Sequence, residues 1–194
     1  MRRLLTLFAL FALAACEQDY EPPFAVPCPP LDDPDTAVEE FSQVSSLLEK
    51  RCGTLDCHGS LYRPFKIYGK DGLRDFLPEE YNDPALAQQN MTFPGGLPTT
   101  ADELALNRLS VCGLEPEKMG QAMVVPAEIE ATDLLLLQKP LGDIDCTGRE
   151  DEGCVRHKGG QVFIGKGADD TVCVKSWIVP PFQNGACTTA IAVD

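Results

Sequence analysis

Two cysteines and a histidine lie close together in the segment Cys52-Gly-Thr-Leu-Asp-Cys57-His58-Gly59. Thiols and imidazoles act as nucleophiles, redox groups and metal ligands, so this segment is the first place to look for chemistry. The simplest interpretation is a Cys52–Cys57 disulfide beside an unused histidine. A zinc site is a second interpretation. However, adjacent Cys57 and His58 suit a tetrahedral ion poorly, and the sequence has no second Cys-x-x-Cys or His-x-x-x-His pair.

A third interpretation is covalent attachment of a haem group. The haem c signature is Cys-x-x-Cys-His, in which two thiols bind the haem vinyl groups and the following histidine binds the iron. Here four residues separate the cysteines instead of two. The longer spacer is compatible with this chemistry, because only the second cysteine and the histidine must be neighbours. We therefore take Cys52, Cys57 and His58 as candidate haem-binding residues, with His58 as an iron ligand.

Three later segments occur in an order that resembles the cytochrome c-like domains common in planctomycetes and myxobacteria. Residues 126–136 are similar to the Pro-Gly-x-Pro-x-x-Ser-x-Leu stretch of that family, with Ala127 in place of its glycine. Lys-Pro-Leu-Gly at 139–142 and His-Lys-Gly-Gly at 157–160 resemble its Lys-Pro-x-Gly and His-Gly-Gly segments. Residues 168–178 resemble its closing helix, which ends in Trp-Ile. The resemblance implies a mainly α, cytochrome c-like helical domain with long loops.

The same resemblance implies a position for the second axial ligand of the iron. In many relatives the methionine of a Met-Pro-Pro segment, between the leucine-rich helix and the last helix, binds the iron; here His157 holds that place. Met119 and Met123 compete with it, since histidine and methionine are the usual axial ligands. An iron bound by His58 and His157 would be saturated and of low potential, which favours electron transfer over chemistry on a substrate. The alternative for His157 is a surface histidine on a glycine loop.

The first residues resemble the signal peptide of a bacterial lipoprotein. Two arginines precede an apolar run, residues 4–13, that is too short to span a bilayer. Leu-Ala-Ala-Cys at 13–16 resembles a lipobox, which implies cleavage after residue 15 and lipid on Cys16. Glu17, where an aspartate would indicate retention at the inner membrane, favours the outer membrane. We expect the domain to be held there by lipid and to face the periplasm or the cell exterior, where disulfides persist.

Charge and motif content narrow the classes of function. The 194-residue chain has a net charge of −14, and loss of the two signal arginines takes it near −16. Nucleic acids select basic surfaces, so we expect no nucleic-acid partner; the expected protein partner is an unidentified redox protein. No Ser-His-Asp set, phosphate loop or paired-carboxylate site stands out, so we do not expect an enzyme. The competing hypothesis is a haem-less, disulfide-stabilised lipoprotein that acts as a binding or accessory module.

The chain divides into four predicted parts: a signal peptide (1–15), a proline-rich extended tether (16–35), the cytochrome c-like domain (36–179) and a C-terminal tail (180–194). Within the domain we predict helices at 36–52, 100–111, 132–138 and 168–178, with loops and short elements at 61–98.

The predicted helices rest on caps, stops and apolar stripes. Thr36 and Thr100 each have a glutamate three residues later, as in a capping box. Pro140 and the prolines at 180–181 are expected to stop the third and fourth helices. The apolar stripes of the first two helices are Val38, Phe41, Val44 and Leu48, then Leu104, Leu106, Leu109 and Val111.

The cysteine count indicates disulfides. Of nine cysteines, Cys16 is assigned to the lipid, and the even set of eight that is left indicates pairing in an exported protein. If Cys52 and Cys57 hold haem, the other six allow fifteen pairings. The pairings that we favour are Cys146–Cys154 around one short loop, Cys173–Cys187 between the tail and the last helix, and the pair that this leaves, Cys28–Cys112.

Overall fold

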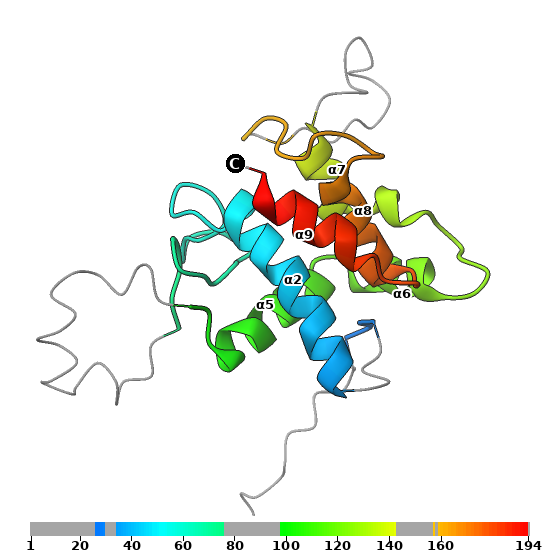
Figure 1. Ribbon diagram of the computed structural model, residues 1–194, viewed down its shortest axis with the longest axis horizontal. Coiled ribbons are helices and arrows are strands. Elements are labelled where there is room, and N and C mark those ends of the chain that lie inside the picture. The colour runs from blue at the N-terminus through cyan, green and yellow to red at the C-terminus, as the bar shows by residue number, and fades with distance from the viewer. Residues whose placement is uncertain (1–25, 30–33, 76–97, 143–156, 158, 194) are drawn as a thin grey trace, which may run out of the picture.

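The computed structural model describes residues 26–29, 34–75, 98–142, 157 and 159–193 (Figure 1). This described part is mainly helical and has no strand beyond one isolated bridge between Tyr68 and Leu73, which confirms the predicted mainly α class. None of its helices has the length and apolar character needed to cross a membrane. The helices are α2 (Pro34–Cys52), α5 (Ala101–Gly113), α6 (Pro116–Met123), α7 (Leu135–Leu141), α8 (Asp169–Ile178) and α9 (Asn184–Ala192), with a 3-10 turn η1 (Ala131–Asp133).

Helix α2 lies at the centre of the fold and packs against α9, α8 and α5 (Figure 1). Phe41, Val44 and Leu48 of the predicted stripe are fully buried, and the Phe41 ring lies 5.0 Å from that of Trp177 in α8. Val38 is 49% exposed, so the stripe begins one turn later than predicted. Burial of this face supplies the hydrophobic stabilisation that fixes the position of Cys52 at the end of the helix.

The two predicted capping boxes have different outcomes. Helix α2 begins at Pro34, so Thr36 lies inside its first turn and the capping box predicted there is wrong. The fixed φ of proline and its missing N–H suit the first helical position. At α5 the prediction is confirmed: Thr100 Oγ1 accepts from the Glu103 N–H at 3.2 Å, and Glu103 Oε2 accepts from the Thr100 N–H at 2.9 Å.

Helix α5 buries two polar and two apolar side chains, so the predicted apolar side is correct only in part. Leu109 is 58% exposed, whereas Glu103 and Asn107 are buried together with Val111. The reason is a hydrogen-bond network between helices. Asn107 Nδ2 donates to Ser45 Oγ of α2 at 2.9 Å and to the Tyr68 carbonyl at 2.8 Å. Because both partners are protein groups, the amide is satisfied at low exposure.

The leucine-rich segment is helical, but Pro140 does not stop it. The predicted helix is split into η1 and α7, and Pro140 lies inside α7, one residue before its end at Leu141. Helix α7 is so short that loss of one N–H near its last turn is tolerated. The Pro140 carbonyl also accepts from the N–H groups of Val162 and Phe163 at 2.7 and 2.8 Å, which attaches the later chain to α7.

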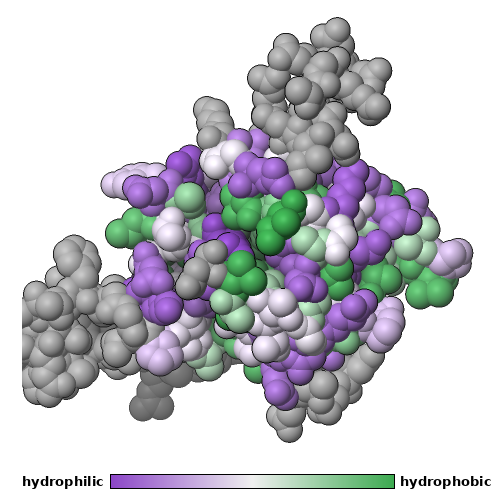
Figure 2. Space-filling view, turned by 45° about the horizontal axis from the view of Figure 1, so that its top comes forward, coloured by the Kyte–Doolittle hydropathy of each residue, from purple (hydrophilic) through white to green (hydrophobic). Residues whose placement is uncertain are grey.

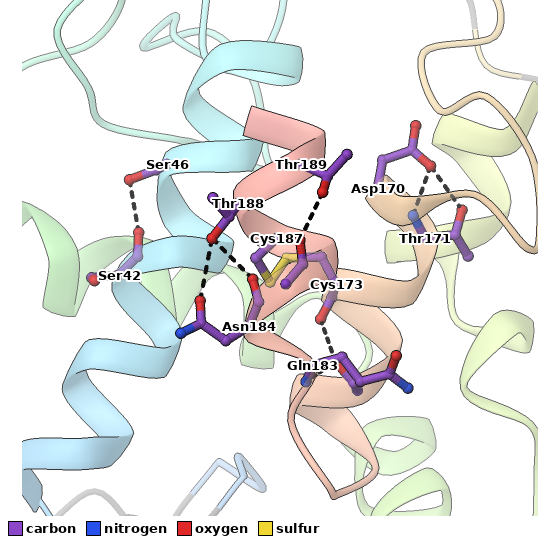
Figure 3. Close-up of a disulfide and its surroundings, with 12 residues drawn as sticks. Ser42, Ser46, Asp170, Thr171, Cys173, Gln183, Asn184, Cys187, Thr188 and Thr189 are labelled. Atoms are coloured by element: carbon purple, nitrogen blue, oxygen red, sulfur yellow. Dashed lines mark hydrogen bonds between the residues drawn. A yellow bond between two sulfur atoms is a disulfide. The ribbon is translucent and has the colours of Figure 1, made fainter. Parts of the chain in front are cut away.

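The segment predicted as a tail, 180–194, contains helix α9, which packs against α8 and α2. Figure 3 shows the Cys173–Cys187 disulfide joining α8 to α9, with Cα atoms 4.6 Å apart. At the far end of α9, Lys50 Nζ donates to the Ile191 carbonyl at 2.9 Å and Arg51 Nη2 donates to the Val193 carbonyl at 3.2 Å. Cations are favourable at the C-terminal end of a helix, which carries a partial negative charge. These contacts therefore fasten the end of α9 to the last turn of α2.

The last part of the predicted tether is attached to the domain. Residues 26–29 are held against α5 by two contacts. Cys28 forms a disulfide with Cys112, and Arg108 Nη2 donates to the Pro29 carbonyl at 2.7 Å. Two favoured disulfides are thus confirmed, Cys28–Cys112 and Cys173–Cys187. The third, Cys146–Cys154, lies outside the described residues, as do the predicted signal peptide and Cys16.

Opening the long-range disulfide should be costly. It closes 84 residues, against 14 for Cys173–Cys187. From the entropy of loop closure, Cys28→Ala/Cys112→Ala should lower the free energy of unfolding by roughly 4–5 kcal/mol, and Cys173→Ala/Cys187→Ala by about 3 kcal/mol. Urea unfolding followed by circular dichroism measures both. If the two double variants lost equal stability, or if Cys173→Ala/Cys187→Ala lost more, loop length would not determine which disulfide stabilises the chain more.

Candidate functional site

The Cys52-to-His58 segment forms a closed turn at the end of α2. The His58 N–H donates to the Cys52 carbonyl at 2.8 Å, and the N–H groups of Cys57 and Gly59 both donate to the Thr54 carbonyl at 2.9 Å. Arg63 Nε, from the following loop, donates to the Cys57 carbonyl at 3.2 Å. These bonds fix the backbone of Cys57 and His58 relative to the helix, so the spacer of four residues is ordered.

Three glycines let this turn pack directly on neighbouring backbone. A Cβ atom on Gly59 would lie 1.9 Å from the Gly53 carbonyl oxygen, and one on Gly72 would lie 1.8 Å from the same atom. Both distances are far shorter than any nonbonded contact between carbon and oxygen, so the close approach requires glycine at 59 and 72. The loop that carries Gly72 thereby covers the turn.

The two cysteines of the segment are free thiols in different surroundings. No disulfide joins Cys52 and Cys57 in the structure, which removes the simplest interpretation of the pair. Cys52 is 6% exposed and belongs to the hydrophobic core, and burial raises the pKa of its thiol to about 12. Cys57 is half-buried. At neutral pH the Cys52 thiol therefore stays protonated, and thiols in that state are poor nucleophiles.

His58 and His157, far apart in sequence, lie close together in space. Their ring centroids lie 6.1 Å apart and their planes are within 18° of parallel. His58 Nδ1 lies 3.0 Å from the Phe65 carbonyl oxygen, and His157 Nδ1 lies 2.9 Å from that of Gly160. A carbonyl oxygen only accepts, so Nδ1 carries the proton in both rings. In the neutral form of each ring the free lone pair is then on Nε2.

Local backbone positions each imidazole. The Phe65 ring packs edge-on to His58, with centroids 4.9 Å apart. On the other side, Gly160 has φ +76°, a conformation that favours glycine, and its N–H donates to the His157 carbonyl at 2.9 Å. A Cβ atom on Gly159 would lie 3.0 Å from the His157 ring. Gly160 thus favours the turn that follows His157, and Gly159 leaves room beside its ring.

The surroundings of His58 keep it neutral. Its pKa is lowered, first by burial and further by electrostatic interaction with His157, Arg63 and Lys139; the Phe65 carbonyl opposes this shift. Neutral imidazole is the form that binds a metal ion. Lys139 belongs to the Lys-Pro-Leu-Gly segment that the sequence analysis singled out. The charge of this segment therefore acts on His58.

Several sequence candidates are not brought to this site. Met119 is 2% exposed and packs in the core, and Met123 is half-buried against the same core on α6. Among the described residues, no group of three or more Cys, His, Asp or Glu side chains is placed to hold a metal ion, which leaves zinc without a ligand set. A haem iron needs only two protein ligands, because the porphyrin supplies the other four.

Sequence reasoning missed the residues that support the histidines. Phe65, Gly72 and Arg63 come from a segment predicted only as loops, and their roles depend on contacts between backbone groups, which leave no periodic pattern. Gly59, directly after the motif, was the one available signal of a close approach.

A small cleft lies elsewhere, between the start of α8 and the end of α9. It has a volume of about 180 Å³, below the roughly 300 Å³ of the smallest usual ligand sites. Figure 2 shows hydrophobic and hydrophilic residues intermixed in small groups over the described part of one face. No family model, curated protein or solved structure matches this chain.

Proposed function

We propose that the chain is a membrane-anchored, monohaem, c-type cytochrome-like electron carrier, with His58 and His157 as the two axial ligands. The observation that carries the proposal is the spacing of the two rings. An imidazole nitrogen binds a transition metal at about 2 Å and lies about 1 Å from its ring centre, so two rings on opposite faces of one ion have centres about 6 Å apart. The observed separation is 6.1 Å.

The hydrogen bonds of the rings support the same assignment. Ligating histidines donate their second N–H to a carbonyl or carboxylate, which fixes the tautomer and the ring plane. The carbonyls of Phe65 and Gly160 do this for His58 and His157. Haem, when bound, supplies an iron that changes oxidation state by one electron. His58 and His157 would hold that iron and the carbonyls of Phe65 and Gly160 would orient them, an arrangement that would favour electron transfer over chemistry on a bound substrate.

The location and partner follow from the sequence. We infer lipid on Cys16, attachment to the outer membrane and a domain that faces the periplasm or the cell exterior. The cleaved carrier would have a net charge near −16, from −14 and the loss of two arginines, which favours a basic surface on its redox partner. Export in an unfolded state also suits a covalent haem, because the cofactor must then be inserted outside the cytoplasm.

The test is haem content. The full chain should be made in a bacterium that carries the c-type cytochrome maturation machinery, then purified and analysed by intact mass and by a reduced-minus-oxidised spectrum. We expect the mass of one haem that survives denaturation and the spectrum of a low-spin cytochrome. A folded chain with no haem mass and no haem absorbance would falsify the proposal and favour the haem-less binding or accessory lipoprotein.

Replacement of His157 tests the ligand assignment. In His157→Ala the iron loses one axial bond, so the oxidised spectrum should change from low-spin to high-spin while the covalent haem mass is kept. Met123→Leu, which conserves volume on α6, serves as the control and should leave the spectrum unchanged. If Met123→Leu alters the spectrum and His157→Ala does not, methionine is the ligand and our assignment is wrong.

A further inference from the structure

The two thiols of the motif are not equivalent. Cys52 lies on the last turn of α2 with 6% of its surface exposed, and its side chain packs in the core cluster. Cys57 lies in the turn that follows, half-buried, directly before His58. A haem held by His58 thus meets the cysteine next to that histidine, whereas the other cysteine faces the protein interior.

The last turn of α2 is held from two sides, so Cys52 cannot easily turn outward. On one side, the Cys52 carbonyl accepts from the His58 N–H at 2.8 Å. On the other side, the neighbouring Lys50 and Arg51 donate to carbonyls at the end of α9 at 2.9 and 3.2 Å. Displacement of the Cys52 backbone would unwind the end of the helix and break both sets of contacts.

The glycine packing adds a third restraint. Gly53, directly after Cys52, has its carbonyl oxygen enclosed by Gly59 and Gly72, where Cβ atoms would approach to 1.9 and 1.8 Å. Rotation of the backbone at 52–53 would drive this oxygen into the two glycines. Densely packed structure of this kind deforms little, so the direction of the Cys52 side chain is fixed in the folded chain.

We propose that haem is attached to this protein through Cys57 alone and that Cys52 stays a free thiol in the core. The inference rests on the proposed function. In the attachment step the Cys57 S–H adds across one vinyl group: a carbon–sulfur bond forms, the thiol hydrogen goes to the other vinyl carbon, and no electrons are exchanged with a third reagent. The second vinyl group stays intact and conjugated with the porphyrin.

The deciding experiment counts thiols in the haem-loaded wild-type chain. The protein is denatured without reduction, alkylated with iodoacetamide and mapped by peptide mass spectrometry. We expect alkylated Cys52 and haem on Cys57 in the same peptide. The pyridine haemochrome band should lie at longer wavelength than that of a cytochrome with two thioether bonds. Haem on both cysteines would overturn the single attachment and leave the proposed function standing; a chain with no haem would overturn both.

Two matched variants repeat the test by substitution. Cys52→Ala should keep the covalent haem mass at the wild-type level, and Cys57→Ala should lose it completely while circular dichroism shows an unchanged helical fold. Loss of covalent haem from a folded Cys52→Ala chain would contradict the proposal. If Cys52→Ala does not fold, the alkylation pattern of the wild-type chain still decides.

Discussion

Gly59→Ala is expected to destabilise the turn that carries His58 and to abolish covalent haem attachment. The new methyl group would start 1.9 Å from the Gly53 carbonyl oxygen, and the nearest atoms on this side are backbone, including the Cα of Gly72 at 2.9 Å. Backbone cannot move aside as a flexible side chain can. The cost should exceed the roughly 1–3 kcal/mol of ordinary overpacking. Urea unfolding and haem mass after denaturation measure the two effects.

The control is Gly185→Ala on α9. A Cβ atom there meets nothing within 4 Å, and the position is exposed and helical. Alanine in a helix is favoured over glycine by roughly 0.5–1 kcal/mol, so this variant should be as stable as the wild type or slightly more stable, with full haem content. If Gly59→Ala behaves like Gly185→Ala, the glycine packing does not hold the motif.

Local signals in the sequence were sufficient for the longer helices. The capping box at Thr100, the stripe beginning at Phe41 and the proline pair after Ile178 each act within one helix, so α2, α5 and α8 could be predicted to within two residues of their ends. The short helices have weaker signals. Helix α6 has only Pro116 at its first position, and α9 has no side-chain cap.

Helix α9 depends on tertiary structure in a way that no local pattern records. Its sequence, Asn184–Ala192, combines three alanines, which favour a helix, with two threonines and one glycine, which do not, and nine residues are too few for a stable isolated helix. What holds it is the disulfide from Cys187 to α8 and the cations of α2 at its end. Packing of this kind overrides propensity. The disulfide pairing was the part of this arrangement that the sequence did indicate.

For the candidate site, sequence reasoning named the two candidate ligands but could not place them. The motif and the order of segments pointed to His58 and His157, and only the folded chain shows their rings 6.1 Å apart. The Pro140 carbonyl attaches residues 162–163 to α7, and the His58 carbonyl accepts from the Ile67 N–H at 2.9 Å. Both are backbone contacts, which any side chain allows.

Glu103→Gln should cause one of the largest losses of stability of any single change in the described chain. The carboxylate is 1% exposed and accepts from Arg74 Nε at 2.8 Å and Arg74 Nη2 at 2.9 Å. It also accepts from the N–H groups of Asp75 and Thr100, each at 2.9 Å. An amide of the same size removes the negative charge and turns an NH₂ group toward donors. Removal of one partner of a buried ion pair costs roughly 3–5 kcal/mol.

The consequence should extend to the segment that we propose binds haem, because Glu103 holds the residues that follow Gly72. With Arg74 and Asp75 released, the loop that covers Gly53 and Gly59 is less restrained, so we expect lower covalent haem content as well as a lower urea midpoint. Asp102→Asn, exposed on the same turn of α5, is the control and should cost less than about 1 kcal/mol. A haem content that stays at the wild-type level in Glu103→Gln, despite the lower midpoint, would separate the ion pair from the site. In that case the glycine contacts alone would hold the loop over His58.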